Sequence, residues 1–127
     1  VERAGKILNR FKKSLNGSKV LILGVAYKQD IDDYRESPAL AVIENFKKCG
    51  TLIDFYDPYI KEYKYKGEMD KGLESLSEKI VSGYDLVVIT TAHTDFDYEM
   101  IAENAVAVFD TKNAMKNVNN RKAIELL

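Results

Sequence analysis

Apolar residues recur with a helical period at the start of the chain and gather into short continuous runs further on. Residues 1–15 place their apolar side chains on one face of a helix, at Val1, Ala4, Ile7, Leu8, Phe11 and Leu15. Lysines occupy the last turn of this segment, and Asn16-Gly17 follows as a stop signal. The pattern therefore predicts a helix over 1–15.

Four short apolar runs predict β-strands. The first covers 19–26 (KVLILGVA) and is apolar almost throughout, which is typical of a strand buried on both faces of a parallel sheet. Three further runs predict strands at 51–56 (TLIDFY), 86–90 (LVVIT) and 106–109 (VAVF).

Helices are expected between these strands. Ser37-Pro38 predicts an N-cap and a first helical residue, and the helix that follows is expected to end at Gly50. Shorter helices are predicted at 75–82 and 98–103. The Lys-, Tyr- and Gly-rich stretch 59–72 is expected to be an exposed excursion, and the chain is expected to close with a polar turn and a short helix.

Strands that alternate with helices predict the fold class. Parallel strands need crossover connections, and these place helices on the faces of the sheet. We therefore expect an α/β protein with a Rossmann-like, three-layer open parallel sheet covered by helices on both faces.

Composition narrows the function classes. The chain has 127 residues, of which 46% are hydrophobic and 31% charged, as in one soluble globular domain. Its net charge of −1 provides no basic field for nucleic acid or a membrane surface, so an anion site must consist of a few local cations. The one cysteine, Cys49, excludes a disulfide framework within the chain and fits a reducing, cytoplasmic location.

Candidate chemistry gathers where the predicted strands end. In open parallel sheets, ligands bind beyond the carboxyl ends of the strands. The residues at these four ends are Tyr27-Lys28, Asp57-Pro58-Tyr59, Thr91-Ala92-His93 and Asp110-Thr111-Lys112. Two lysines and the chain's one histidine are therefore expected at the same edge of the sheet.

The turn after the first strand differs from a dinucleotide-binding loop. Such a loop needs several glycines so that the backbone can touch pyrophosphate, whereas this turn has Gly24 and then Ala26. A side-chain cation, Lys28, could instead bind a phosphate or carboxylate, and Arg35 offers a planar fork to a second anion.

Less specific interpretations of the same residues stay open. Lys28 also fits a solvated surface lysine, and His93 also fits a hydrogen-bonded structural group. The three aspartates between Lys28 and Arg35 either shape the loop or hold these cations: Asp30, Asp32 and Asp33.

The stretches GVAYKQDIDDYRESPAL, YDP and FDTKNA together resemble the C-terminal domain of the UDP-glucose/GDP-mannose dehydrogenase family. The likeness covers nearly the whole chain and is most specific at 24–38. GVAYK, DDYRESP and TTAHTDFDY look most like the branch that acts on UDP-N-acetylhexosamines, typified by UDP-N-acetylglucosamine 6-dehydrogenase.

The resemblance implies a piece of a three-part enzyme that makes polysaccharide precursors. An N-terminal domain would bind NAD, a central region would dimerise, and residues 18–127 would bind the UDP-sugar. Residues 1–17 would be the end of the helix from the central region, and the full-length enzyme is expected to be a homodimer or higher oligomer. The sugar C6 alcohol would be oxidised to a carboxylate in two hydride transfers on an upstream cysteine, so this fragment alone is expected to be inactive.

Family roles are carried over by matching motifs. The aromatic-Lys pair is Tyr27-Lys28, which would lie at the nucleotide sugar. Arg35 matches an arginine that reaches toward NAD. Lys112 stands where many members have arginine near the substrate, so it keeps the charge and loses the fork. No catalytic residue and no metal ligand is carried over, and Cys49 does not match the catalytic motif.

Two other functions are compatible with the fold. A receiver-like signalling domain belongs to the same doubly wound class, but it needs an acidic pair directly after the first strand, where Tyr27-Lys28 stands. A stand-alone nucleotide-binding module is the second. A helix that begins at Val1 favours a longer parent protein over this module.

Overall fold

The computed structural model describes all residues 1–127 as an α/β protein. Its helices are α1 (Glu2–Arg10), α2 (Pro38–Lys48), α3 (Glu78–Ser82) and α4 (Tyr98–Asn104). Its strands are β1 (Lys19–Leu23), β2 (Leu52–Tyr56), β3 (Glu62–Tyr65), β4 (Glu68–Lys71), β5 (Leu86–Ile89), β6 (Val108–Asp110) and β7 (Ile124–Leu126).

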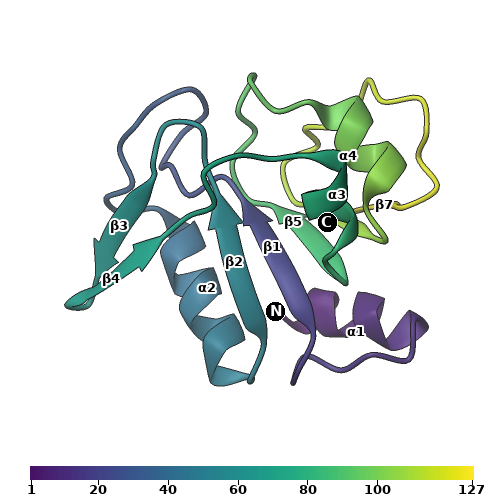
Figure 1. Cartoon of the computed structure of the whole chain (residues 1–127), viewed down its shortest axis with the longest axis horizontal. Coiled ribbons are helices and arrows are strands. Elements are labelled where there is room, and N and C mark those ends of the chain that lie inside the picture. Colours follow the sequence, from purple (N-terminus) through teal and green to yellow (C-terminus); the bar gives the residue numbers. More distant parts are fainter.

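Five of the strands form one parallel sheet in the order β2-β1-β5-β6-β7 (Figure 1). The order in which the chain adds strands to this sheet reverses at β1. The next strand, β2, lies on one side of β1, and β5, β6 and β7 lie on the other side. Such a switch point opens a crevice beyond the carboxyl ends of β1 and β5, where ligands of doubly wound sheets bind.

Helices cover both faces of this sheet. One face, which includes Val20 and Ile22 of β1, packs against α1 and α2 in a single apolar cluster. The other face, which includes Leu21 and Leu23, packs against α3 and α4. Because successive strand residues point to opposite faces, this strand is apolar throughout. The predicted three-layer open parallel sheet is confirmed.

The first helix is shorter than its apolar pattern predicts. It ends at Arg10 because Lys12 adopts the left-handed conformation, with φ +60°. The backbone N–H of Lys13 then donates to the carbonyl of Leu8 and that of Lys12 to the carbonyl of Asn9. This pair of bonds is a Schellman cap, which normally uses glycine.

The stretch 59–72 is more ordered than an exposed excursion. Strands β3 and β4 pair antiparallel as a separate hairpin beside α2 (Figure 1). The ring of Tyr63 is buried against Phe55 of β2, with ring centroids 5.1 Å apart. That contact fastens the hairpin to the domain.

The C-terminal end also differs from the prediction. Instead of a short helix it forms β7, which pairs parallel to β6 at the edge of the sheet. Three residues are too few to show a period in the sequence, so the strand exists through its pairing with β6. None of the four helices combines the length and apolar character that a bilayer crossing needs.

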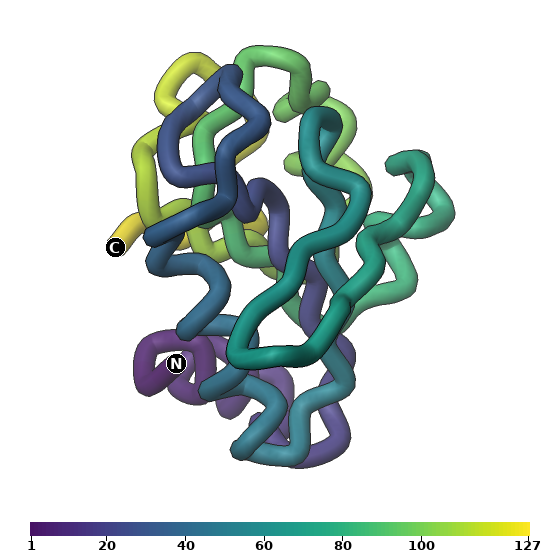
Figure 2. The backbone as a smooth tube through the Cα atoms, turned by 90° about the vertical axis from the view of Figure 1, so that its left-hand side faces the viewer, coloured from purple at the N-terminus to yellow at the C-terminus, as the bar shows by residue number.

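Figure 2 shows where these connections place the candidate chemistry. The loops that follow β1, β2 and β5 lie together at one end of the molecule. This end is the carboxyl edge of the sheet, where the sequence predicts the site.

Candidate functional site

The carboxyl ends of β1 and β5 touch at Gly24. This residue has φ +89°, and a Cβ built on it would lie 2.4 Å from Cβ and 2.7 Å from the carbonyl oxygen of Thr91. The hydroxyl of the neighbouring Thr90 donates to the carbonyl of Gly24. Glycine is therefore needed here so that two strand ends can meet, which gives this glycine a role within the sheet.

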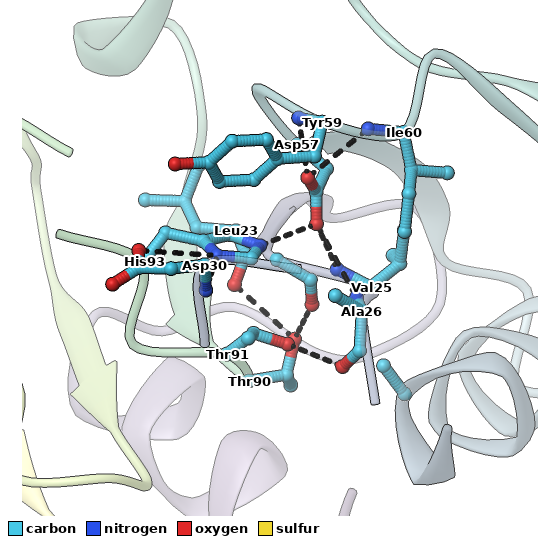
Figure 3. Close-up of polar contacts among 12 residues, drawn as sticks. Leu23, Val25, Ala26, Asp30, Asp57, Tyr59, Ile60, Thr90, Thr91 and His93 are labelled. Atoms are coloured by element: carbon cyan, nitrogen blue, oxygen red, sulfur yellow. Dashed lines mark hydrogen bonds and ion pairs between the residues drawn. The ribbon is translucent and has the colours of Figure 1, made fainter. Parts of the chain in front are cut away.

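Asp57, directly after β2, is the anchor of the site. Its Oδ2 accepts from the backbone N–H of Val25 at 2.8 Å and of Ala26 at 3.3 Å. Its Oδ1 accepts from the N–H of Tyr59 at 2.8 Å and of Ile60 at 3.2 Å (Figure 3).

The carboxylate of Asp57 stays charged although it is buried. Burial by itself would raise its pKa, but hydrogen bonds from His93 and from backbone N–H groups outweigh that effect and hold the pKa below its usual range. A buried anion thus fixes the loops after β1 and β2 to each other.

His93, after β5, completes the link. Its fully buried ring places Nε2 2.8 Å from Oδ2 of Asp57, and its Nδ1 accepts from the backbone N–H of Asp30 at 2.8 Å (Figure 3). These partners assign a neutral ring with its proton on Nε2. Because both nitrogens are occupied, His93 is placed as a structural group and has no free nitrogen to act as a base.

Asp30 closes the loop from the other side. Its carboxylate accepts from the backbone N–H of Thr94 at 2.8 Å and from the Thr94 hydroxyl at 2.6 Å. These two bonds, led by the hydroxyl, lower the pKa of Asp30. The loop after β1 is therefore tied to the loop after β5 by both its backbone and its side chain.

Asp33 holds a cation, as one of the two sequence interpretations of the acidic loop expects. Its carboxylate oxygens accept from Nε and Nη2 of Arg35, each at 3.0 Å. The Arg35 side chain is nevertheless 83% exposed. Its fork faces solvent beside the loop, away from the residues that gather around His93.

Lys28 stands between fixed residues. On its N-terminal side, Tyr27 donates its N–H to the carbonyl of Asp33 at 2.8 Å, and on its C-terminal side Asp30 is bound to His93. The side chains of Tyr27 and Lys28 are both exposed, and the Lys28 ammonium lies 5.9 Å from the Tyr27 ring centroid. The structure thus presents an aromatic-Lys pair to solvent on a tied loop.

A cleft of about 550 Å³ opens beside this loop at the carboxyl edge. Its lining includes Gln29, His93 and Lys112, so the loops after β1, β5 and β6 contribute to one cleft. Lys28 is one residue away from this lining, and Arg35 lies outside it. The predicted gathering of His93 and Lys112 is therefore found.

The loop that carries Lys112 is ordered by a second buried aspartate. Asp110, at the end of β6, accepts from the backbone N–H of Lys112, Ala114 and Met115 at 2.9 to 3.1 Å. Sequence reasoning did not identify Asp57 or Asp110 as loop anchors. The available signal was an aspartate at the carboxyl end of a predicted strand, because such a carboxylate can accept from the N–H groups that follow it. No group of three or more His, Cys, Asp or Glu side chains is placed to hold a metal ion.

Comparison with known proteins adds independent evidence. The family model described as the UDP-glucose/GDP-mannose dehydrogenase family, UDP binding domain, matches residues 21–117. The chain is 37% identical over 123 residues to the UDP-N-acetyl-D-mannosamine dehydrogenase of Methanocaldococcus jannaschii, covering 91% of this chain and 26% of that protein. It is 31% identical over 87 residues to the UDP-N-acetyl-D-glucosamine 6-dehydrogenase of Salmonella typhi, covering 67% and 20%.

A solved structure shows the same fold. The UDP-D-ManNAc dehydrogenase of Pyrococcus horikoshii superposes with a TM-score of 0.74 at 27% identity, over 95% of this chain and 28% of that one. The chain spans about a quarter of the length of the curated relatives it matches.

Proposed function

Because the chain belongs to the UDP-glucose/GDP-mannose dehydrogenase family, as its UDP-binding domain, we propose that it binds the UDP-sugar substrate of an NAD-dependent nucleotide-sugar 6-dehydrogenase. The family indicated by GVAYKQDIDDYRESPAL, YDP and FDTKNA is thereby confirmed. The match argues against a receiver-like signalling module, although such modules share this strand order.

The carboxyl edge at the β1–β5 switch point supports this proposal. The diphosphate of a UDP-sugar, with both phosphates esterified, carries about two negative charges. Lys28 and Lys112 offer two ammonium groups on the loops after β1 and β6, in a chain whose net charge is −1. Tyr27 adds a half-exposed ring on which a base can pack. These three side chains are our candidates for contact with the UDP-sugar.

The chemistry itself would come from other parts of the enzyme. Cys49 caps the end of α2, just before β2 begins, so it lies at the amino edge of the sheet, opposite the proposed site. It is therefore not placed to attack a substrate bound at Lys28. A thiolate and an NAD site would be supplied by upstream domains, in which the C6 alcohol of a UDP-hexose or UDP-N-acetylhexosamine is oxidised to a carboxylate.

Arg35 fits a contact with that partner domain. Its guanidinium is exposed at the rim and is oriented by Asp33. A planar fork held in this way can bind a phosphate of NAD presented from outside the chain. This proposal makes the cleft a joint one, with the UDP-sugar on this domain and the cofactor on the N-terminal domain of the same full-length chain. The full-length enzyme would be a homodimer or higher oligomer.

Binding of UDP-glucose and UDP-N-acetylglucosamine to the chain, measured by titration calorimetry, tests the proposal. Lys28→Ala and Lys112→Ala are each expected to weaken binding by about tenfold, the effect of losing one charged hydrogen bond at an exposed site. Lys6→Ala is the matched control, because Lys6 lies on α1 and pairs with Glu2. If both site variants bind as tightly as the control, the proposed site is wrong.

A further inference from the structure

The hydrogen bonds of His93 connect loops of the fold and do not reach the surface where an anion would bind. Three loops that are far apart in the sequence meet on one buried imidazole, which has Asp30 on one nitrogen and Asp57 on the other. The ring touches solvent nowhere, so it does not contact a substrate. Its contacts instead fix the segment that carries Tyr27 and Lys28.

We propose that neutral His93 is a positioning residue, which holds the loop after β1 in the conformation that presents Lys28, and that protonation of its Nδ1 releases that loop. The proposal rests on the proposed function only where it assigns UDP-sugar binding to Lys28. The predicted change in the loop itself does not depend on the ligand.

Titratable groups lie near the imidazole on each of the segments that pack against it. Asp57 follows β2, and Asp30, on the loop after β1, has Oδ1 3.9 Å from Nδ1. Tyr59 packs edge-on against the ring at 4.9 Å, with its hydroxyl bound to Asp95. Tyr98, at the start of α4, donates to the His93 carbonyl, and Lys112 lines the cleft beside it.

Two carboxylates flank this imidazole, Asp57 at Nε2 and Asp30 near Nδ1. Both carboxyl pKa values lie below their usual range, for Asp57 because hydrogen bonds outweigh burial and for Asp30 because of Thr94. The two carboxylates therefore stay charged to a lower pH than ordinary aspartates do.

Protonation changes the loop at a defined point. A proton on Nδ1 would face the N–H of Asp30, so two donors would oppose each other across 2.8 Å. Oδ1 of Asp30 lies 3.9 Å from Nδ1 and already accepts from Thr94. Val25 and Ala26 stay bound to Asp57. Tyr27 stays bound to Asp33, and the Asp30 carboxylate stays bound to Thr94. The loop is therefore loosened at the backbone of Asp30, two residues after Lys28.

The chain contains a single histidine, so its titration can be followed directly by NMR of the imidazole nitrogens. We expect the affinity for UDP-glucose to fall by about tenfold as His93 becomes protonated, because one hydrogen bond of the loop is lost. UDP-glucose is the suitable probe because both of its phosphates are esterified, so their charge does not change while the imidazole is titrated. The proposal is supported if the affinity for UDP-glucose falls around the same pH at which NMR shows His93 to be half-protonated. An affinity that does not follow the protonation of His93 overturns it.

Two substitutions separate the bonds of the ring. His93→Asn places an amide oxygen near the position of Nδ1 and can still accept from Asp30, whereas His93→Gln places an amide N–H near Nε2 and keeps only the bond to Asp57. We expect the affinity of His93→Asn to stay close to that of the unchanged chain and that of His93→Gln to be about tenfold weaker. Neither variant should show the acid-dependent loss. Equal affinities for the two variants would contradict the proposal.

A ligand-free measurement keeps this test apart from the proposed function. The protection of the Asp30 amide against hydrogen exchange, taken relative to its intrinsic exchange rate at each pH, should fall as His93 becomes protonated, and the amide resonances of Tyr27 and Lys28 should shift with the same midpoint. If UDP-glucose does not bind at any pH but these amides follow His93, the proposed function fails and the positioning role stands. If the sugar nucleotide binds and the amides do not respond, the positioning role fails alone.

Discussion

At the scale of single residues, the candidate site is held together by buried groups. Gly24 lets the ends of β1 and β5 touch, and Asp57 gathers backbone N–H groups from two loops. The exposed Lys28 has its position only because its neighbours are held in this way. A substitution at a buried position can therefore weaken ligand binding as much as a substitution at an exposed one.

Replacing Gly24 by alanine should be costly for this reason. Gly24→Ala combines a left-handed backbone with an overlap against Thr91, so we expect a loss of about 3 kcal/mol in the free energy of unfolding. Gly17→Ala is the control, because Gly17 has φ +84° with nothing within 4 Å of an added Cβ. It should cost about 1 kcal/mol, from the backbone alone. Urea unfolding measures both, and equal losses would show that the overlap with Thr91 is relieved at no cost.

At the scale of elements, the first helix and the last strand brace each other. Arg10 of α1 donates to the Glu125 carboxylate at 2.8 Å, and Arg3 donates to the carbonyl of Leu126 at 2.8 Å. The Arg3 guanidinium also lies 5.4 Å from the centroid of the Phe109 ring in β6. These contacts explain how a strand as short as β7 is held at the edge of the sheet.

Removing the Glu125 carboxylate should loosen both α1 and β7. Glu125→Ala is expected to lower the local stability of α1 and β7 by about 1 kcal/mol, since the lost pair is partly exposed. Amide hydrogen exchange should accelerate in these two elements and stay unchanged in β1 and β5. Glu2→Ala removes only an exposed pair with Lys6 and serves as the control. Uniformly faster exchange through the whole sheet would contradict this local role.

At the scale of the whole molecule, candidate chemistry is divided between the two edges of the sheet. The lysines and the cleft lie at the carboxyl edge, whereas the cysteine lies at the opposite edge. The turn after β1 has Ala26 where a cofactor-binding loop needs its second glycine, and the Tyr27-Lys28 pair follows. The candidate ligand-binding side chains thus lie at the carboxyl edge of the sheet, and the cysteine lies at its amino edge.

This distribution predicts that the chain by itself does not oxidise UDP-sugars. Incubated with NAD and UDP-glucose or UDP-N-acetylglucosamine, it should produce no NADH, because thiolate and cofactor site are not placed together in it. The UDP-N-acetyl-D-mannosamine dehydrogenase of Methanocaldococcus jannaschii is a suitable positive control with its own substrate. Turnover by this chain that survives Cys49→Ser would show that it holds both a cofactor site and another nucleophile.

The sequence by itself determined the elements whose signals are local. The capping of α2 is one example: Ser37 accepts from the N–H of Ala39, and Pro38 is the first helical residue, as predicted. The continuous apolar run through β1 likewise specified a central parallel strand. Both signals depend on residues a few positions apart, so they can be recognised without knowing the rest of the fold. The strand ends, and with them the positions of the two lysines that we propose for the site, followed from these elements.

Only the tertiary structure decided what connects those ends. The bonds of His93 to Asp30 and to Asp57 join positions 63 and 36 residues apart. They exist because β1 lies between β2 and β5, an order that no local pattern encodes. The same reason explains β7, whose three residues become a strand through their pairing with β6. Periods and caps are properties of a segment, whereas partners across a sheet are properties of the strand order.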